Sequence, residues 1–252
     1  MIAAIIQARM SSSRLPGKVL LPLLGRTMLE HVVERVRRAP VDRVVVATSN
    51  ETEDDAIAQL CATKNYDVFR GSKDDVLDRY YRAAIAYDCD DIVRVTSDCP
   101  LVDPAVLGEL ISSYRTSEYD YLSSFVPAER TFPRGLDCEI FSFRALEDAA
   151  RHARETYERE HVTPYIWENK EGKFAVGPML IASAAYAHPE FRLTVDYDED
   201  YDLMRHLYER FYKEGEIVST PHVVEYLSTH PEVTAINAFR DEEYPKQGIR
   251  KK

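Results

Sequence analysis

Three cationic side chains and three hydroxyls follow directly on a short apolar run near the N-terminus. The segment 8–18 reads ARMSSSRLPGK and contains Arg9, Arg14 and Lys18. A triphosphate needs several positive charges with hydroxyl and backbone donors, and arginine adds bidentate geometry. Cations at one strand end repel each other unless an anion lies among them. The segment therefore predicts a polyphosphate site, with a basic surface turn as the alternative. It is not a P-loop, because GxxxxGK[ST] is absent.

Two aspartates each end a later apolar run. Asp98 follows residues 91–96, and Asp196 follows residues 191–195. Strand ends at one edge of a parallel sheet lie close together, and two converging carboxylates repel each other unless a cation is present. Mg²⁺ prefers a few carboxylates, completed by phosphate oxygens and water. We therefore expect Asp98 and Asp196 to hold Mg²⁺ and turnover to need a divalent cation. The alternative is that both aspartates cap the elements that follow.

Further polar residues stand at other predicted strand ends. Arg70 and Gly71 follow a short strand, and the glycine permits close approach of a ligand to the backbone. The alternative for Arg70 is an ion pair with Asp74 or Asp75. Asp103 precedes Pro104 and is interpreted as a helix N-cap. The acids 199 and 200 are interpreted as residues of a helix start, where negative charge is favourable.

The predicted elements alternate between strand and helix through the first half of the 252 residues. We expect strands at 2–7, 43–48, 67–69, 91–96 and 119–123, and helices at 28–36, 53–64, 74–87 and 104–114. Short connections between such elements predict a mainly parallel sheet with helices on both faces. In the second half we expect strands at 136–143 and 191–195, and helices at 145–152, 159–168, 198–212 and 221–228. Without repeats or a low-complexity linker, the chain is interpreted as one continuous domain.

Composition narrows the class of protein. The net charge of −11 argues against a nucleic-acid binder. The first 50 residues nevertheless carry eight Lys/Arg against three Asp/Glu, which suits a small anionic ligand. Arg35, Arg37 and Arg38 are interpreted as the solvated face of a helix. No apolar run approaches the roughly 20 residues that span a bilayer. Four widely spaced cysteines without a CxxC pair favour a reducing cytoplasm.

The first segment carries a resemblance to a known family. Ala8, Arg9, Arg14, Pro16 and Lys18 resemble the N-terminal signature of the CMP-sugar-acid synthetases, which include the CMP-KDO and CMP-N-acylneuraminate synthetases. The stretch IIQARMSSSRLPGKVL is most similar to their spore-coat polysaccharide branch. The resemblance implies a Rossmann-like three-layer α/β/α sandwich of the nucleotide-diphospho-sugar transferase type. It also implies a single cytidylyltransferase domain over 1–252, with a less regular acceptor and dimerisation region around 130–190.

The resemblance further implies an activity. CMP would pass from CTP to a KDO-, neuraminate- or pseudaminate-like sugar acid with release of pyrophosphate, for a surface or spore-coat polysaccharide. The implied catalytic residues are Arg9, Arg14, Lys18, Asp98 and Asp196, the last two on magnesium. The implied nucleotide-binding residues are Ala8, Arg9, Ser13, Arg14, Lys18, Arg70, Gly71 and Ser97. The alternatives are a nucleotidyltransferase for another base or sugar, and a non-catalytic nucleotide-binding subunit.

Two later stretches resemble acceptor-side and dimer-contact segments of these enzymes. They hold two polar clusters, Arg134, Asp137 and Glu139, and Arg159, Glu160 and His161. The aromatic and aliphatic residues 165–167 beside the second cluster have the composition of an interface, which predicts a homodimer. The alternative is that they fill the chain's own core. We also expect Arg14 and Lys18 to be exposed loop cations that contribute little to stability.

Overall fold

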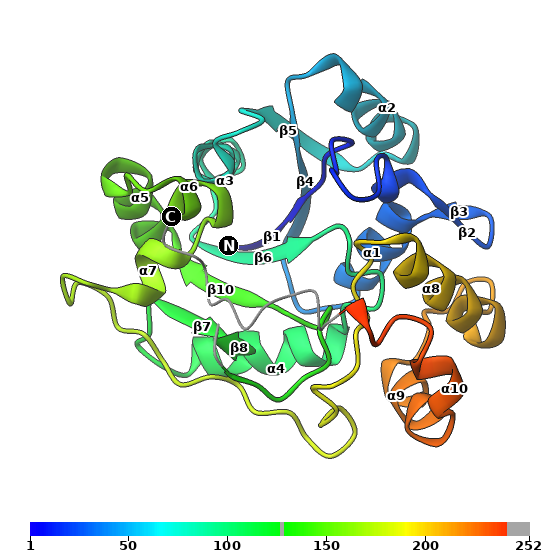
Figure 1. Cartoon of the computed structure of the whole chain (residues 1–252). Helices are drawn as coiled ribbons and strands as arrows, with labels where there is room; N and C mark the ends of the chain where they lie inside the picture. Colours follow the sequence, from blue (N-terminus) through cyan, green and yellow to red (C-terminus); the bar gives the residue numbers. More distant parts are fainter. Residues whose placement is uncertain (127–128, 241–252) are drawn as a thin grey trace.

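A six-stranded sheet forms the centre of the molecule, in the order β5-β4-β1-β6-β10-β7 (Figure 1). The computed structural model describes residues 1–126 and 129–240. Four neighbouring strands run parallel: β5 (Asp67–Gly71), β4 (Arg43–Ser49), β1 (Ile2–Gln7) and β6 (Asp91–Thr96). The strand β10 (Glu139–Ser142) is antiparallel to β6 and to β7 (Tyr121–Ser123). The predicted, mainly parallel sheet is confirmed.

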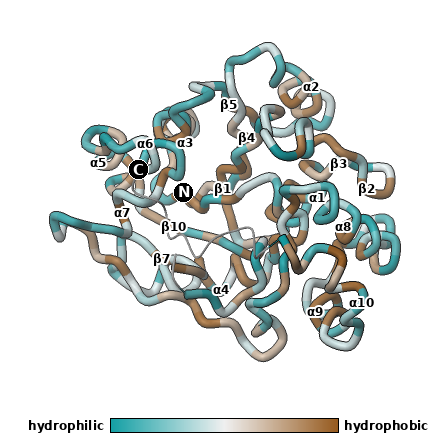
Figure 2. Tube along the Cα trace, in the orientation of Figure 1, coloured by the Kyte–Doolittle hydropathy of each residue, from teal (hydrophilic) through white to brown (hydrophobic). Residues whose placement is uncertain are grey.

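Helices cover both faces of this sheet. Alternate residues of β1 point to opposite sides, so that Ala4 and Ile6 pack in one core cluster and Ala3 and Ile5 in the other. The first cluster is covered by α1 (Met28–Val36), α2 (Asp55–Lys64) and α4 (Pro104–Arg115), and the second by α3 (Val76–Ala86) and α5 (Phe143–His152). Figure 2 shows the hydrophobic stretches of β1 and β4 inside the molecule. The expected three-layer α/β/α arrangement is confirmed.

Local signals in the sequence set several helix starts. Thr27 and Glu30 form a capping box at the start of α1. Asp103 accepts a hydrogen bond from the Ala105 N–H at 2.8 Å and caps α4, as predicted. The remaining elements are short strands or C-terminal helices. They are β2 (Pro22–Leu23), β3 (Arg26–Thr27), β8 (Phe125–Val126), β9 (Glu129–Arg130), α8 (Asp198–Phe211), α9 (Thr220–Thr229), α10 (Pro231–Thr234) and the 3₁₀ helices Lys18–Leu20 and Thr52–Asp54.

Two predicted elements of the second half are wrong. Residues 191–195 form no strand of the sheet. They make a single bridge between Arg192 and Arg134, and the Val195 N–H then bonds to the Asp98 carbonyl at 2.8 Å. The predicted helix at 159–168 is two helices, α6 (Thr156–His161) and α7 (Pro164–Glu168). The break falls at Val162, whose φ of 72° lies outside the helical range, and Pro164 then begins α7 at a position that proline favours.

Arg35 corrects a further expectation, since it is buried instead of solvated. Only 1% of the residue is exposed, and its guanidinium donates to the carbonyls of Val102 and Val218 at 2.6 Å each. Arg35 therefore connects α1 to the segments that precede α4 and α9. These segments cover the side of α1 that the sequence analysis had expected to face solvent. No helix in the described part of the chain is long and apolar enough to cross a membrane.

Candidate active site

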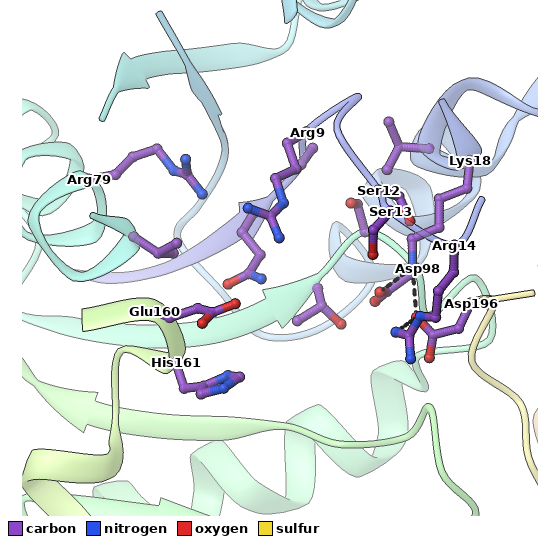
Figure 3. Close-up of a pocket in the computed structure, with 16 residues that line it drawn as sticks. Arg9, Ser12, Ser13, Arg14, Lys18, Arg79, Asp98, Glu160, His161 and Asp196 are labelled. Atoms are coloured by element: carbon purple, nitrogen blue, oxygen red, sulfur yellow. Dashed lines mark hydrogen bonds and ion pairs between the residues drawn. The ribbon is translucent and has the colours of Figure 1, made fainter. Parts of the chain in front are cut away.

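A cavity of about 250 Å³ lies at the carboxyl ends of β1 and β6, beside α3 and α6 (Figure 3). The ends of parallel strands in α/β proteins are where ligands bind, because the loops there converge. Eight of the residues that the sequence predicted line this cavity: Ala8, Arg9, Ser13, Arg14, Lys18, Ser97, Asp98 and Asp196. They come from three segments far apart in the chain, which the sheet brings together.

Lys18 lies at the centre of one end of the cavity. Its Nζ donates to Asp98 Oδ2 at 2.8 Å, to Asp196 Oδ1 at 2.9 Å and to the Val195 carbonyl at 2.7 Å. The loop delivers Lys18 inward because Gly17, with φ of 72°, turns the chain into the 3₁₀ helix that Lys18 begins. The two aspartates converge on one ammonium group, as predicted, although Asp196 follows an irregular segment and not the expected strand.

The expectation that Lys18 is an exposed loop cation is wrong, since only 7% of the residue is exposed. Burial works against its charge, but Asp98 and Asp196 outweigh burial and raise the pKa of Lys18. For Asp98, burial again works against the charge, and the Lys18 ammonium outweighs it and lowers the pKa of the carboxyl. Lysine and carboxylate thus hold each other ionised.

Asp196 is held from two sides. Arg14 donates to Oδ1 at 2.6 Å, and Arg192 donates to Oδ2 at 2.9 Å. Arg192 is itself fixed by Asp200, with bonds of 2.8 and 3.0 Å, and both side chains are completely buried. Asp200 also accepts from the Asp196 N–H at 2.9 Å at the start of α8. Asp200 therefore has the predicted role at the helix start and a second role, because it positions Asp196 through Arg192.

The remaining predicted residues of the cavity present backbone and hydroxyl groups. Ser97 is buried, and its N–H bonds to the Gln7 carbonyl at 3.1 Å. The Ala8 N–H bonds to the Ala47 carbonyl at 3.1 Å, so Ala8 holds the loop against β4. Ser13 is exposed on the loop that faces the cavity. These contacts fix the loop backbone around the arginines.

Arg70 and Gly71 do not line this cavity. Arg70 donates to the carbonyls of Ser49 and Glu51 at 2.9 and 3.0 Å and forms an ion pair of 2.7 Å with Asp55. The sequence had suggested an acid on the following helix as the alternative partner, whereas the structure uses one on α2. The predicted contact of Arg70 and Gly71 with the nucleotide stays a prediction.

The other end of the cavity is lined by residues that the sequence analysis had placed on the acceptor side and by one residue that it had missed. Glu160 and His161 line it from α6, and Arg79 lines it from α3 (Figure 3). Arg79 was missed because it was interpreted as part of an ordinary helix. The signal was available, since Arg79 stands three residues after Val76 and four before Ala83, on the buried face. Reduced solvent around the His161 ring, with Arg94 nearby, lowers its pKa although the residue lies at the cavity mouth.

The other predicted acceptor residues have structural partners outside the cavity. Arg159 pairs with Asp75 at 2.6 Å. Glu139 is buried and pairs with Arg94 at 2.6 Å. Asp137 accepts two hydrogen bonds from Arg130, Arg134 donates its N–H to the Phe191 carbonyl, and neither residue lines the cavity. Of the two clusters, only Glu160 and His161 reach the cavity.

Paired carboxylates and several cations at the carboxyl edge of a parallel sheet suit an enzyme that binds a nucleoside triphosphate and displaces pyrophosphate. The site and fold thus indicate a nucleotidyltransferase. A family model described as cytidylyltransferase matches residues 3–219. The spore coat polysaccharide biosynthesis protein SpsF of Bacillus subtilis is 36% identical over 239 residues, covering 92% of this chain and 95% of that protein.

Two further proteins extend the comparison. The 3-deoxy-manno-octulosonate cytidylyltransferase of Synechococcus elongatus is 40% identical over 121 residues, 46% of this chain and 48% of that protein. The solved structure of a cytidylyltransferase from Leptospira borgpetersenii is 35% identical, with a TM-score of 0.84, and covers 92% of this chain and 96% of that one. The chain belongs to the cytidylyltransferase family and is a CTP-dependent nucleotidyltransferase.

Proposed function

We propose that this enzyme transfers CMP from CTP to a hydroxyl of a sugar acid for a surface or spore-coat polysaccharide. The observation that carries the proposal is the convergence of Asp98 and Asp196 on Lys18, with Arg14 on the same carboxylate. Such a site binds a triphosphate by its cations and a metal ion by its acids. The relatives named for spore-coat polysaccharide and for 3-deoxy-manno-octulosonate support the pathway and the sugar-acid acceptor.

Under this proposal the protein's part in the reaction is positioning and neutralisation of charge. Arg9, Arg14 and Lys18 bind the phosphate oxygens, with Ser13 and Ser97 as additional hydroxyl donors. Hydrogen-bond donors that are already in position then stabilise the negative charge that develops on the leaving pyrophosphate. Such stabilisation provides most of the rate enhancement in phosphoryl-type transfer. All three donors of the Lys18 ammonium are in use, so Lys18 must exchange at least one of these bonds for a phosphate oxygen when CTP binds.

The carboxylate pair fits a magnesium ion in its chemistry. The ammonium of Lys18 already takes a position between Asp98 and Asp196, which shows that the pair accepts a cation. Within the described residues no group of three or more His, Cys, Asp or Glu side chains could hold a metal ion. We therefore propose that Mg²⁺ binds to Asp98 and Asp196 together with CTP, whose phosphates complete the shell. An ion held by these two carboxylates would supply Lewis-acid polarisation of the α-phosphate.

The metal proposal has a test that does not depend on turnover. In a K18M variant the ammonium no longer competes for the carboxylates, so Mg²⁺ should raise the melting temperature of K18M more than that of the wild type. Adding D98N to K18M should abolish that effect. An equal response of all three proteins to Mg²⁺ would contradict the assignment.

The sugar acid would occupy the end of the cavity that Glu160 and His161 line. Both side chains are exposed at the cavity mouth and can exchange hydrogen bonds with hydroxyl groups.

We further propose that the enzyme is a homodimer. We also propose that it acts in the cytoplasm, because its four cysteines are buried and free. Of the proposed interface residues, Ile166 is buried in the chain's own core, whereas Tyr165 and Trp167 pack at its edge.

The test of the function is pyrophosphate release from CTP with a panel of acceptors. The panel should hold KDO, N-acetylneuraminate, pseudaminate and, as counter-examples, glucose 1-phosphate and mannose 1-phosphate. The proposal predicts release with one sugar acid, none without acceptor, and loss of release in D98N. Release with a sugar phosphate alone would replace the sugar acid as acceptor, and no release with any acceptor would favour a non-catalytic role.

A further inference from the structure

Arg79 is a buried cation that forms no ion pair with a carboxylate among residues 1–126 and 129–240. Only 1% of the residue is exposed, and its Nη1 donates to the Ser72 carbonyl at 2.7 Å. Its Nε is buried and has no hydrogen-bond partner in the structure. A charged donor that is shielded from water and left without a counter-charge strongly destabilises a protein unless something else pairs with it.

Arg9 faces the same space from the end of β1. Within the described residues it forms no ion pair, and in Figure 3 the guanidinium groups of Arg9 and Arg79 both extend into the cavity. Burial lowers the pKa of Arg79, and the neighbouring positive charge of Arg9 lowers it further. The two guanidiniums carry like charges that repel each other, and an anion bound between them would remove that repulsion.

The acids nearest to Arg79 are engaged elsewhere. Asp75 pairs with Arg159 at 2.6 Å. Asp54 accepts from the Met10 N–H at 2.7 Å and from the hydroxyl and N–H of Ser49. Glu160 lines the cavity but is exposed and makes no ion pair with either arginine. Asp75 and Asp54 are therefore bound by other groups, and neither forms an ion pair with Arg79.

The local fold is shaped around the Arg79 side chain. A Cβ added at Gly71 would lie 3.1 Å from Cγ and 3.3 Å from Cβ of Arg79, so the glycine leaves room for the arginine stem at the end of β5. Gly71 had been predicted to permit close approach of a ligand. That contact stays a prediction, and the space beside Gly71 is taken by Phe69 and by the arginine that reaches the cavity.

We propose that Arg79 and Arg9 form an oxyanion subsite, separate from the Lys18 centre, that binds a phosphate or carboxylate group of a substrate. This inference rests on the proposed function for the identity of the substrates. The phosphate source is the polyphosphate tail of CTP, and the carboxylate source is the sugar acid. A carboxylate is planar and a phosphate is tetrahedral, and each presents oxygens that can accept two parallel hydrogen bonds from one guanidinium.

Binding measurements on R79Q test the subsite. Calorimetry would use pyrophosphate, CTP and cytidine for the phosphate source, and KDO in the presence of CMP for the carboxylate source. Loss of a charge-assisted hydrogen bond should weaken binding about 10- to 100-fold. Weaker pyrophosphate and CTP with unchanged cytidine would assign the phosphate. Weaker KDO with unchanged pyrophosphate would assign the carboxylate.

The matched control is R82Q, the same change on the same helix. Arg82 is 65% exposed in its side chain, pairs with Asp78 and lies outside the cavity, so R82Q should bind every probe as the wild type does. If R79Q does not fold, R79K decides, because it keeps the charge and loses the planar fork. We expect R79K to bind the assigned anion more weakly than the wild type does.

Two outcomes separate failure of the subsite from failure of the proposed function. The subsite alone is overturned if a folded R79Q, or R79K in its place, binds pyrophosphate and CTP as the wild type does. In that case KDO binding must also be the same in variant and wild type, or absent from both. A wild-type protein that binds neither CTP nor pyrophosphate overturns the proposed function as well.

Discussion

Replacing Lys18 by methionine should destabilise the protein far more than loss of an ordinary surface lysine. The side chains of Lys18 and Asp196 are each 9% exposed and that of Asp98 is 27% exposed. Removing one partner of a buried pair costs about 3–5 kcal/mol, because the other charge is left unpaired. Asp196 keeps Arg14 and Arg192, so we expect the lower value, about 3 kcal/mol. For a domain of this size that is a loss of roughly 6–12 °C in melting temperature.

The pH dependence of this loss follows from the two pKa shifts. Asp98 has a lowered pKa, so its contribution is complete above its ordinary value of 3.8 and disappears as the pH falls through the lowered value. Lys18 has a raised pKa, so its contribution is complete below its ordinary value of 10.5 and disappears as the pH rises through the raised value. The difference between wild type and K18M should therefore be largest, and flat, between these limits and should shrink in acid.

Urea unfolding at several pH values measures this difference. The matched control is K73M, since Lys73 makes an ion pair of the same length, 2.8 Å, with Glu53 on the surface and should cost under ~1 kcal/mol. The double variant K18M/D98N should cost less than the two single changes together, by about 0.5–3 kcal/mol. A K18M protein as stable as K73M, or strictly additive effects, would refute the reasoning.

Three further predictions concern the support of the site and the assembly. Asp200→Ala should cost about 3 kcal/mol in urea unfolding, because Arg192 loses both bonds to its completely buried partner and keeps the bond to Asp196; a loss under ~1 kcal/mol would be inconsistent with that pairing. Gly135→Ala should lower the melting temperature by at least several degrees, because the added Cβ would lie 2.5 Å from the Leu193 carbonyl carbon at a φ of 104°; calorimetry showing an unchanged transition would contradict the strain. Light scattering at micromolar concentration should show a dimer, and a monomer would reject the interface proposed at 159–167.

Much of the first half of the fold was predictable because local signals there agree with the tertiary structure. Asp98, two residues after β6, and Lys18, in the loop that follows β1, were selected from residue type and from their place after apolar runs, and both line the cavity. Thr27 and Asp103 marked helix starts by capping chemistry that acts within three residues. Such signals depend on few neighbours, so the sequence alone expresses them.

The errors occur where long-range packing decides the outcome. The segment 191–195 is apolar enough for a strand, yet it lies against the loop that contains Asp98, which no periodicity could show. Arg35 is a buried arginine whose partners, the carbonyls of Val102 and Val218, come from distant segments. Arg70 is drawn to carbonyls at the end of β4 and to Asp55, and that pairing depends on the register of two neighbouring strands.

The most direct test of the central claim is ³¹P NMR of the products formed from CTP, Mg²⁺ and the sugar acid that the acceptor panel identifies. Transfer of CMP to a hydroxyl predicts equal amounts of pyrophosphate and a single phosphodiester resonance, with no diphosphate in the sugar product. A CDP-sugar made from a sugar phosphate, or CTP left intact with every sugar acid, would contradict the account.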